Sequence, residues 1–147
     1  YLLLFIPLLL MGCYATNPIH KGRVVELYER NEMHFVDITL NGIKTKLLID
    51  TGASKSLLDI SQAETYGFEF VLLSKNQYVG LGGFQDIYVT YGFKVDEFYI
   101  PFLGTDLSEV QNYFIRDDIN IVGVLGSDFL EKHKVSIDFN SNKLYIR

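Results

Sequence analysis

The feature that most constrains this fold is a β-hairpin that ends in a carboxylate. Residues 34–40 alternate between apolar and polar side chains, which is typical of a strand with one buried face. Asn41-Gly42 follows, and this dipeptide strongly favours a two-residue hairpin turn. In the return strand, residues 43–49, a register slip of one position would bury both lysines, so the register is well defined. The hairpin therefore delivers Asp50 at its far end.

Asp50 follows an apolar strand and is itself followed by small and hydroxyl-bearing residues, Thr51 to Ser54. An unpaired carboxylate at a buried strand end loses its hydration, so such a residue is either well hydrogen-bonded or retained for chemistry. Gly52 allows a tight turn in which backbone can approach a neighbour or ligand closely. We interpret Asp50 as half of a catalytic carboxylate pair. The alternative is a structural Asp that caps a turn with its own side chain.

Composition narrows the classes of function. The 147 residues are enough for one domain with a sizeable core, and 10 Tyr, 11 Phe and 12 Gly with only 3 Pro indicate a strand-rich globular chain. The net charge of -5 includes no run of Lys or Arg, which excludes a nucleic-acid footprint. A single Cys excludes an internal disulfide framework, and the 3 His lack zinc-ligand spacing. No metal or organic cofactor is therefore expected.

Residues 1–13 carry no charged side chain. This run is shorter than the roughly 20 apolar residues of a membrane-spanning helix, and Pro7 interrupts it. It fits the apolar core of a secretory signal, and its end, Leu10-Met11-Gly12-Cys13, resembles a bacterial lipoprotein signal in which Cys13 is lipidated. The alternatives are an ordinary signal peptide, or a signal anchor, with an incidental Cys.

The lipoprotein interpretation divides the chain into three parts. Residues 1–12 are a secretory signal segment, residues 13–22 a tether, and residues 23–147 the folded domain. The expected location is the bacterial periplasm or cell envelope, with a lipid at Cys13 as the only membrane attachment, or else secretion.

Short elements are expected on both sides of the hairpin. A first strand is expected at residues 24–28. A short helix is expected at residues 59–66, because Ser61 and Glu64 have capping-box spacing and Gly67 is a natural helix stop.

Glycines punctuate the middle of the chain, at residues 80–83. The helix and Lys that a phosphate-binding loop would require do not follow, so a hairpin tip is the better interpretation, either a plain turn or a functional flap. Strands are expected at residues 87–91 and 93–102. Residues 104–120 are expected to form a surface loop with one helical turn at residues 107–113.

The last part of the chain is again strongly patterned. A glycine-punctuated apolar strand begins at Ile121 and meets a helix whose free N–H groups Ser127 or Asp128 could cap. A final hairpin is expected from residues 135–139 and 144–146.

Three segments together resemble the retropepsin-like aspartic proteases. Residues 48–54, Leu-Ile-Asp-Thr-Gly-Ala-Ser, are similar to the catalytic signature of that family. Gly80 to Gly83 resemble its flap, and residues 124–130, Val-Leu-Gly-Ser-Asp-Phe-Leu, resemble its late strand and helix. The order and spacing of these three segments agree with those of the family, and the resemblance covers roughly residues 24–147. The resemblance implies a mostly β, single-domain acid protease fold with one or two short helices, of a bacterial periplasmic type.

The resemblance also implies roles for individual residues. Asp50 would be the catalytic carboxylate, Thr51 would brace its loop by hydrogen bonding across a dimer, and Gly52 would let substrate backbone approach. Asp128 would be a structural acid. The substrate-binding flap and floor would be Ala53, Ser54, Gly80, Leu81, Gly82 and Gly83.

One Asp-Thr-Gly sequence supplies only one of the two carboxylates that aspartic protease chemistry requires. The dyad therefore implies a symmetric homodimer that cleaves a peptide or protein substrate. The family resemblance implies in addition that the C-terminal residues 144–146 could supply interface strands. The alternative is a non-catalytic module of the same fold that captures an extended peptide by strand addition.

Overall fold

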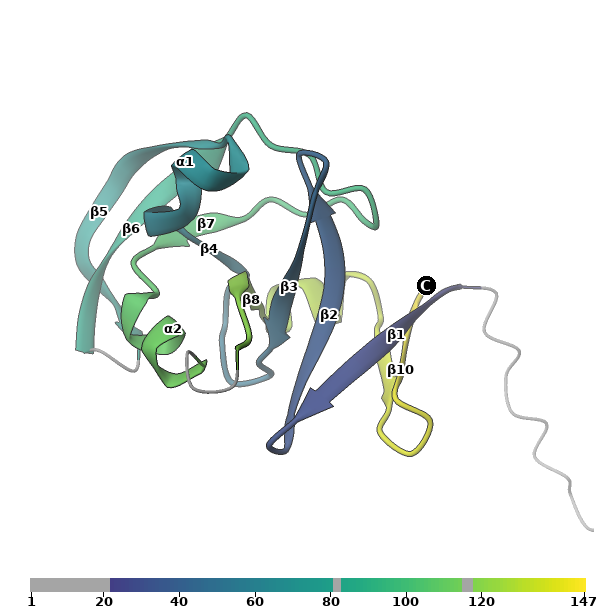
Figure 1. The fold of residues 1–147 in the computed structure, drawn as a ribbon. Helices are drawn as coiled ribbons and strands as arrows, with labels where there is room; N and C mark the ends of the chain where they lie inside the picture. Colours follow the sequence, from purple (N-terminus) through teal and green to yellow (C-terminus); the bar gives the residue numbers. More distant parts are fainter. Residues whose placement is uncertain (1–21, 81–82, 115–117) are drawn as a thin grey trace, which may run out of the picture.

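The computed structural model describes residues 22–80, 83–114 and 118–147 and shows a single domain built mainly of strands (Figure 1). The strands are β1 (Arg23–Arg30), β2 (Met33–Leu40), β3 (Ile43–Ile49), β4 (Leu57–Asp59), β5 (Glu69–Gly80), β6 (Gly83–Tyr91), β7 (Leu103–Thr105), β8 (Ile121–Leu125), β9 (Ser136–Asp138) and β10 (Lys143–Ile146). The helices are the 3₁₀-helix η1 (Ile60–Gln62), α1 (Ala63–Tyr66), α2 (Ser108–Phe114) and α3 (Ser127–Lys132). The predicted mostly β fold class is confirmed.

The described strands form one continuous sheet in the order β5-β6-β7-β4-β8-β3-β2-β1-β10-β9. The first half of β1 pairs with β10 and its second half pairs with β2, so the sheet bends at Leu27. Figure 1 shows β1 and β10 standing to one side of the β2–β3 hairpin. The bend lets the sheet fold around its own apolar face.

The predicted hairpin is confirmed. Asn41 and Gly42 have φ angles of 48° and 82°, as a type I′ turn requires at both central positions. Lys46 lies opposite Asp37 and forms an ion pair with it on the solvent side. Leu47 is fully buried, so the register places apolar and charged side chains on the expected faces.

Strand β8 is inserted between β3 and β4, parallel to the first and antiparallel to the second. At its centre, a Cβ atom on Gly123 would overlap the Leu57 carbonyl oxygen. Only glycine permits this close approach of two backbones. The insertion places the end of β8 beside the end of β3, where Asp50 follows.

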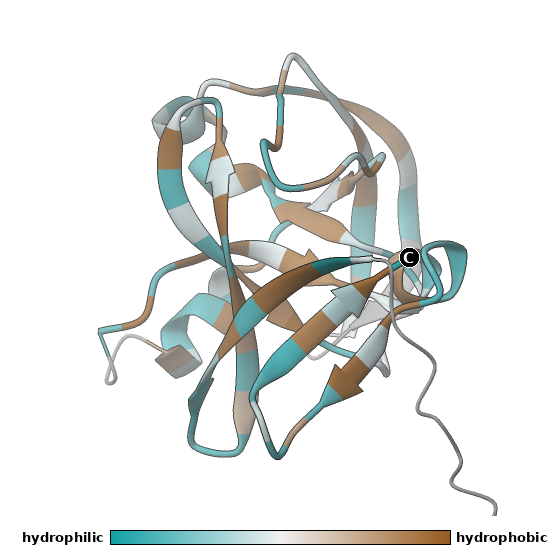
Figure 2. Cartoon of the chain, turned by 90° about the vertical axis from the view of Figure 1, so that its right-hand side faces the viewer, coloured by the Kyte–Doolittle hydropathy of each residue, from teal (hydrophilic) through white to brown (hydrophobic). Residues whose placement is uncertain are grey.

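The core has a main and a minor cluster. The main cluster gathers side chains from the first, middle and last parts of the chain, among them Ile38, Leu47, Leu125 and Phe129. Burial of each such side chain contributes roughly 1.5–3 kcal/mol to stability. Figure 2 shows hydrophobic and hydrophilic residues alternating along several strands, as expected for sheets with one buried face.

The helix expected at residues 59–66 begins as the 3₁₀-helix η1 and continues as α1. Ser61 does not cap it; the buried Asp59 does, since its carboxylate accepts a hydrogen bond from Ser61 N at 3.1 Å. The expected stop at Gly67 is confirmed, with φ 68° at the C-cap.

The strand expected at residues 93–102 is wrong. These residues are irregular and contribute a single bridge, between Val95 and Leu40. Backbone pairing is limited to the bonds around this bridge, such as Asp96 N to Thr39 O at 3.1 Å. The Glu97 carboxylate adds hydrogen bonds from Thr39 N at 2.8 Å and from Thr39 Oγ1 at 3.1 Å. The apolar pattern here reflects packing against the core without a continuous strand.

The surface loop expected at residues 104–120 is also wrong in part. This segment contains the end of β7 and the whole of α2, close to the helical turn expected at residues 107–113. It is anchored in the interior by the minor cluster, which consists of Phe35, Phe114, Ile119 and Ile121. The segment is therefore an integral part of the core.

The C-terminal hairpin is confirmed as β9 and β10. However, β10 pairs with β1 along one edge and with β9 along the other. The structure holds one chain, so the expectation that residues 144–146 supply strands of a dimer interface stays a prediction. The free edges of the described sheet belong to β5 and β9.

The predicted signal segment, residues 1–12, and the tether with Cys13 lie outside the described residues, apart from Gly22. Among the helices of the described part, none has the length and hydropathy needed to cross a bilayer. The proposed division of the chain into these parts stays a prediction.

Candidate active site

Asp50 occupies the first position after β3 and extends its parallel pairing with β8. Its N–H donates to the Leu125 carbonyl at 3.1 Å. The chain then turns at once, because the Asp50 carbonyl accepts from Ala53 N at 3.1 Å and Asp50 Oδ1 accepts from Gly52 N at 2.8 Å. Asp50 therefore makes the turn-capping bond of a structural Asp, and this bond uses one of its two carboxylate oxygens.

The turn at residues 50–54 lies at the surface. Asp50, Thr51, Gly52 and Ser54 are exposed, and Ala53 is half-buried. Within the described part of the chain, the Asp50 carboxylate forms no ion pair, and its only hydrogen bond comes from its own turn. The second carboxylate oxygen therefore has no hydrogen-bond partner among the described residues.

The turn is fixed to the corner where β8 enters α3. Ala53 O accepts from Ser127 N at 2.8 Å, and Ser56 Oγ accepts from Gly126 N at 2.9 Å. Ser56 Oγ also donates to Asp128 Oδ1 at 2.7 Å. These bonds join two of the segments that carried the family resemblance, residues 48–54 and 124–130, into one rigid unit.

Glycine is required at this corner, because a Cβ atom on Gly126 would lie 2.6 Å from the Lys55 carbonyl carbon and oxygen. The N-cap of α3 is Gly126, so neither Ser127 nor Asp128 occupies the N-cap position. The Asp128 carboxylate does bind a free N–H group of the first turn, because its Oδ1 accepts from Phe129 N at 2.8 Å as well as from Ser56 Oγ.

Ser56 was missed by sequence reasoning. It is 0% exposed and holds both Gly126 N and Asp128 Oδ1. The available signal was a hydroxyl directly before the apolar pair Leu57-Leu58, since a buried Ser must find hydrogen-bond partners.

The glycine-rich segment is the tip of a long hairpin. Gly80 pairs with Gly83, where β5 turns into β6. Gly83 has φ 92°, a left-handed conformation that favours glycine. Leu81 and Gly82, expected at the flap tip, lie outside the described residues. Figure 1 shows this hairpin tip and the turn after β3 at the same, lower end of the molecule.

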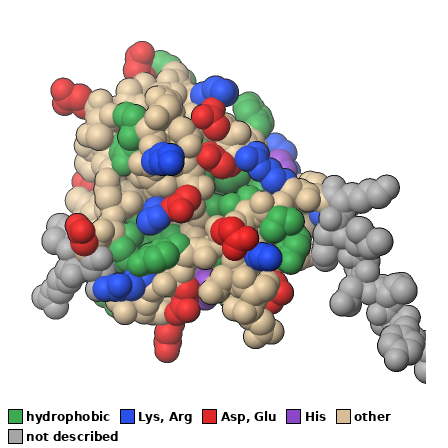
Figure 3. All heavy atoms as spheres, turned by 45° about the vertical axis from the view of Figure 1, so that its right-hand side comes forward, with side chains coloured by type: hydrophobic (Ala, Val, Ile, Leu, Met, Phe, Trp, Pro, Cys, Tyr) green, Lys and Arg blue, Asp and Glu red, His purple; other side chains and the backbone are tan. Residues whose placement is uncertain are grey.

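The described residues contain no group of three His, Cys, Asp or Glu side chains that could hold a metal ion. On the face shown in Figure 3, acidic and basic side chains are interspersed with hydrophobic ones. The turn itself offers the carboxylate of Asp50, the hydroxyls of Thr51 and Ser54, and its backbone groups.

Comparison with known families adds a direct match. The sequence profile of the family described as Aspartyl protease matches residues 36–129, which run from β2 to the middle of α3 and include the Asp50 turn and the Gly126 corner. This chain belongs to the aspartyl protease family. A comparison with curated proteins finds no significant match.

Solved structures show the same fold. A retropepsin-like aspartic protease from Rickettsia conorii matches with TM-score 0.51 and 18% identity over 85% of this chain and 89% of the other. EIAV protease, in complex with the inhibitor HBY-793, matches with TM-score 0.52 and 18% identity over 76% and 98%. The retroviral protease-like domain of Ddi1 from Leishmania major matches with TM-score 0.50 and 25% identity over 84% and 90%. The fold of this aspartyl protease family member is therefore retropepsin-like.

Proposed function

We propose that this chain is an aspartic endopeptidase and that Asp50 is its catalytic carboxylate. The observation that carries the proposal is the position of Asp50, exposed at the end of β3 in a turn that is fixed to the β8–α3 corner. Hydrogen-bonded turns on rigid elements hold a reacting group in one geometry, which is what catalysis by positioning requires.

The reaction needs a second carboxylate, and we propose that a second copy of the chain supplies it. Two carboxylates at contact distance cannot both ionise, so they share a proton. The ionised Asp50 would accept a proton from water, whose oxygen attacks the scissile carbonyl carbon. The protonated Asp50 of the other copy would donate to the carbonyl oxygen. Collapse then breaks the C–N bond: the leaving amine takes the proton that the first Asp50 accepted from water, and the second Asp50 recovers its proton from a hydroxyl of the tetrahedral intermediate.

The geometry of the turn suits this role. Because Gly52 N donates to Oδ1 of Asp50, that oxygen is oriented by its own chain, while the other oxygen accepts no hydrogen bond from the described residues. Thr51 and Gly52 are exposed beside it, and we propose that Thr51 braces the turn across the dimer while Gly52 lets substrate backbone approach. Ala53 and Ser54 would form the floor and Gly80 to Gly83 the flap.

A binding module is the second candidate, and one observation favours it. β5 lies at an end of the sheet, and it carries a run of exposed apolar side chains from Phe70 to Leu73. A free edge of this kind can pair with an extended peptide by strand addition. A module that only binds peptides would work as a monomer and would not depend on Asp50.

The experiment that separates the two candidates uses purified protein and a mixed peptide library between pH 4 and 7. We expect cleavage by the wild type and none by the Asp50→Asn variant, with the variant as stable to urea as the wild type. Cleavage that survives in Asp50→Asn, or peptide capture without cleavage by the folded wild type, would contradict the peptidase proposal.

We further propose that Cys13 carries a lipid that anchors the protein in the bacterial cell envelope. The uncharged run before Cys13 supports this proposal. Metabolic labelling with a fatty-acid analogue should mark the wild type and leave Cys13→Ser unlabelled. Equal labelling of both would exclude Cys13 as the attachment site.

A further inference from the structure

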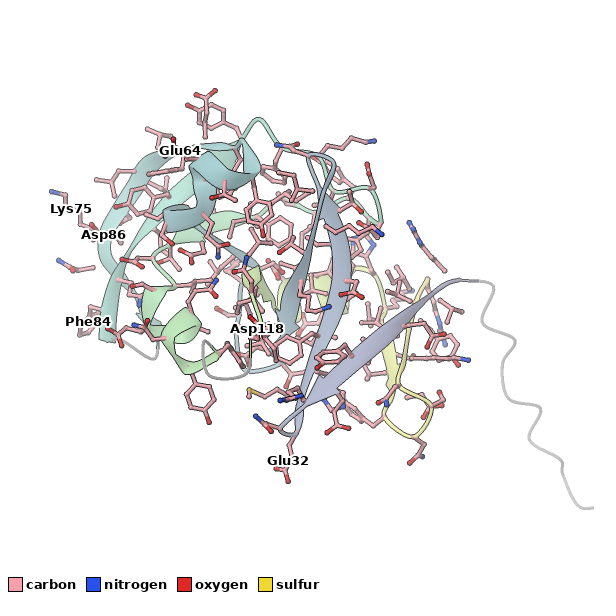
Figure 4. All side chains as sticks on the ribbon, viewed as in Figure 1. Glu32, Glu64, Lys75, Phe84, Asp86 and Asp118 are labelled. Atoms are coloured by element: carbon pink, nitrogen blue, oxygen red, sulfur yellow. The ribbon has the colours of Figure 1, made fainter. Side chains whose placement is uncertain are left out.

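The outer part of the β5–β6 hairpin stands apart from the rest of the sheet. β6 pairs with β7 only at Tyr88 and Val89. Toward the tip, β6 has β5 as its only strand neighbour. We call residues 75–80 and 83–87 the outer arm. Figure 4 shows Lys75, Phe84 and Asp86 on this arm, at the side of the molecule opposite β1 and β10.

Packing fixes the outer arm against the body only at its base, where Ile87 is buried. A hollow of about 440 Å³ lies beside the arm, lined by residues of the arm, of β7 and of the start of α2, including Phe84, Asp106 and Glu109. Phe84 is 71% exposed. Because interior packing is what usually holds a strand pair in place, hydrogen bonds must supply the position here.

A buried hydroxyl makes these bonds. Thr105, at the end of β7, is 1% exposed, and its Oγ1 lies 2.9 Å from the Asp86 carbonyl oxygen and 2.9 Å from Gln85 Oε1. A hydroxyl has one proton, so it donates to one of these acceptors at a time. Both acceptors belong to the outer arm, at one and two positions beyond Ile87, where β6 no longer pairs with β7.

The base of the arm contains a β-bulge, which the side chain of Asp86 stabilises by a hydrogen bond. Between the pairs Ser74–Ile87 and Tyr78–Gln85, β5 advances further than β6, so its extra residues bulge out. Within the bulge Asn76 has φ 50°, and its N–H donates to Asp86 Oδ1 at 2.9 Å. Asp86 thus accepts the hydrogen bond of the Asn76 N–H, a group that the bulge removes from the pairing between β5 and β6.

We propose that Thr105 and Asp86 are positioning residues that set the outer arm relative to the active-site turn. The inference rests on the proposed peptidase function, in which this hairpin covers the substrate. Thr105 holds the arm to the body through the Asp86 carbonyl, and the Asp86 carboxylate sets the bend of the bulge. Neither residue touches the Asp50 turn, so both act through the arm.

Loss of the hydrogen bonds of Thr105 to the arm should weaken substrate binding more than it slows the chemical step. Without the hydroxyl, the arm samples more positions, and ordering it on a bound peptide costs conformational entropy. Loss of one hydrogen bond of ordinary net strength should weaken substrate binding by roughly two- to twelve-fold. The Asp50 turn keeps its own bonds to the β8–α3 corner, so kcat should change little.

The test compares Thr105→Val, which keeps the shape and removes the hydroxyl, with Thr105→Ser, which keeps the hydroxyl. Backbone hydrogen exchange is measured on the full chain without substrate. In Thr105→Val, exchange at residues 84–87 should rise about five-fold, while β2 and β3 stay as in the wild type. KM for a cleaved peptide should rise about five-fold with kcat within about two-fold, and Thr105→Ser should match the wild type in both.

A second pair of variants tests the bulge and serves if Thr105→Val does not fold. Asp86→Ala removes the acceptor for Asn76 N, whereas Asp86→Asn keeps an oxygen at that position. Faster exchange at residues 75–78 in Asp86→Ala, restored in Asp86→Asn, supports the inference.

Two results would overturn it. One is exchange in the arm that is equal in Thr105→Val and Thr105→Ser. The other is exchange that rises equally across β2 and β3, which would indicate a general loss of stability. Since exchange needs no substrate, it decides the inference even if the wild type cleaves nothing. A folded wild type that cleaves nothing would count against the peptidase proposal and not against this inference.

Discussion

Ser56 Oγ lies 2.7 Å from Asp128 Oδ1, and this bond joins a turn and a helix that are 72 positions apart in the sequence. The same oxygen accepts from Gly126 N at 2.9 Å. One buried hydroxyl thus connects the segment after Asp50 to the corner between β8 and α3. The orientation of the Asp50 turn depends on a residue that does not touch the carboxylate itself.

Ser56→Ala should destabilise the fold by about 1–3 kcal/mol, because it leaves Gly126 N without its hydrogen-bond acceptor and removes one of the two hydrogen bonds to Asp128 Oδ1. Urea denaturation measures the change. Ser54→Ala is the matched control in the same turn, and since Ser54 is exposed it should change stability by less than about 0.5 kcal/mol. Equal stabilities for the two variants would show that the Ser56 bonds do not hold the turn.

Asp59→Ala should also destabilise the fold by roughly 1–3 kcal/mol. The Asp59 carboxylate is 0% exposed, and its Oδ1 accepts from Ser61 N at 3.1 Å and from Leu107 N at 3.2 Å. It therefore links the start of η1 to the segment that leads into α2. Asp59→Asn keeps an oxygen acceptor and should lose less stability in the same denaturation experiment. A larger loss in Asp59→Asn than in Asp59→Ala would contradict this account.

Gly123→Ala should prevent folding or cost more than about 3 kcal/mol, because its Cβ would overlap the backbone of Leu57. Gly42→Ala is a useful comparison. Gly42 has φ 82° but open space around it, so only backbone strain of about 1–2 kcal/mol is expected. Circular dichroism and thermal unfolding distinguish the outcomes. A Gly123→Ala protein as stable as Gly42→Ala would mean that β8 and β4 are not in close contact.

Hydrogen bonds lower the pKa of Asp138 below its ordinary value of 3.8; the largest effect comes from the Ser141 side chain, followed by the backbone N–H groups of Ser141 and Asn140. Because the folded-state pKa is depressed, the contribution to stability is present above the ordinary value and is lost as pH falls through the folded-state value. Ser141→Ala should therefore raise the pKa of Asp138, which an NMR titration of its carboxyl carbon measures. An unchanged titration would show that the Ser141 hydroxyl does not bind the carboxylate.

Local signals predicted the local structure. The alternation around Asn41-Gly42 and the helix stop at Gly67 depend on a few adjacent residues, and both are confirmed. The segments that were predicted wrongly depend on distant partners. Residues 93–102 are not a strand because their backbone pairs with the end of β2 only around Val95, and beyond that bridge the Glu97 carboxylate binds Thr39.

At the candidate site too, the sequence predicts features that depend on adjacent residues and misses those that depend on distant partners. Asp50 stands out in the sequence because a carboxylate at the end of an apolar strand is unusual. The residues that hold the Asp50 turn do not stand out, since Ser56 and Asp128 are brought together only when β8 is inserted between β3 and β4. The family resemblance named both segments, and the hydrogen bonds explain why they occur together.

The most direct test of the central claim mixes wild-type and Asp50→Asn chains in equal amounts under conditions that allow subunit exchange. If each active site requires one Asp50 from each of two copies, random pairing leaves about one quarter of the dimers active. The peptidase activity at constant total protein should then fall to about one quarter of the wild-type value. A fall to only about one half would mean that each chain acts alone, and this result would contradict a dyad shared between two copies.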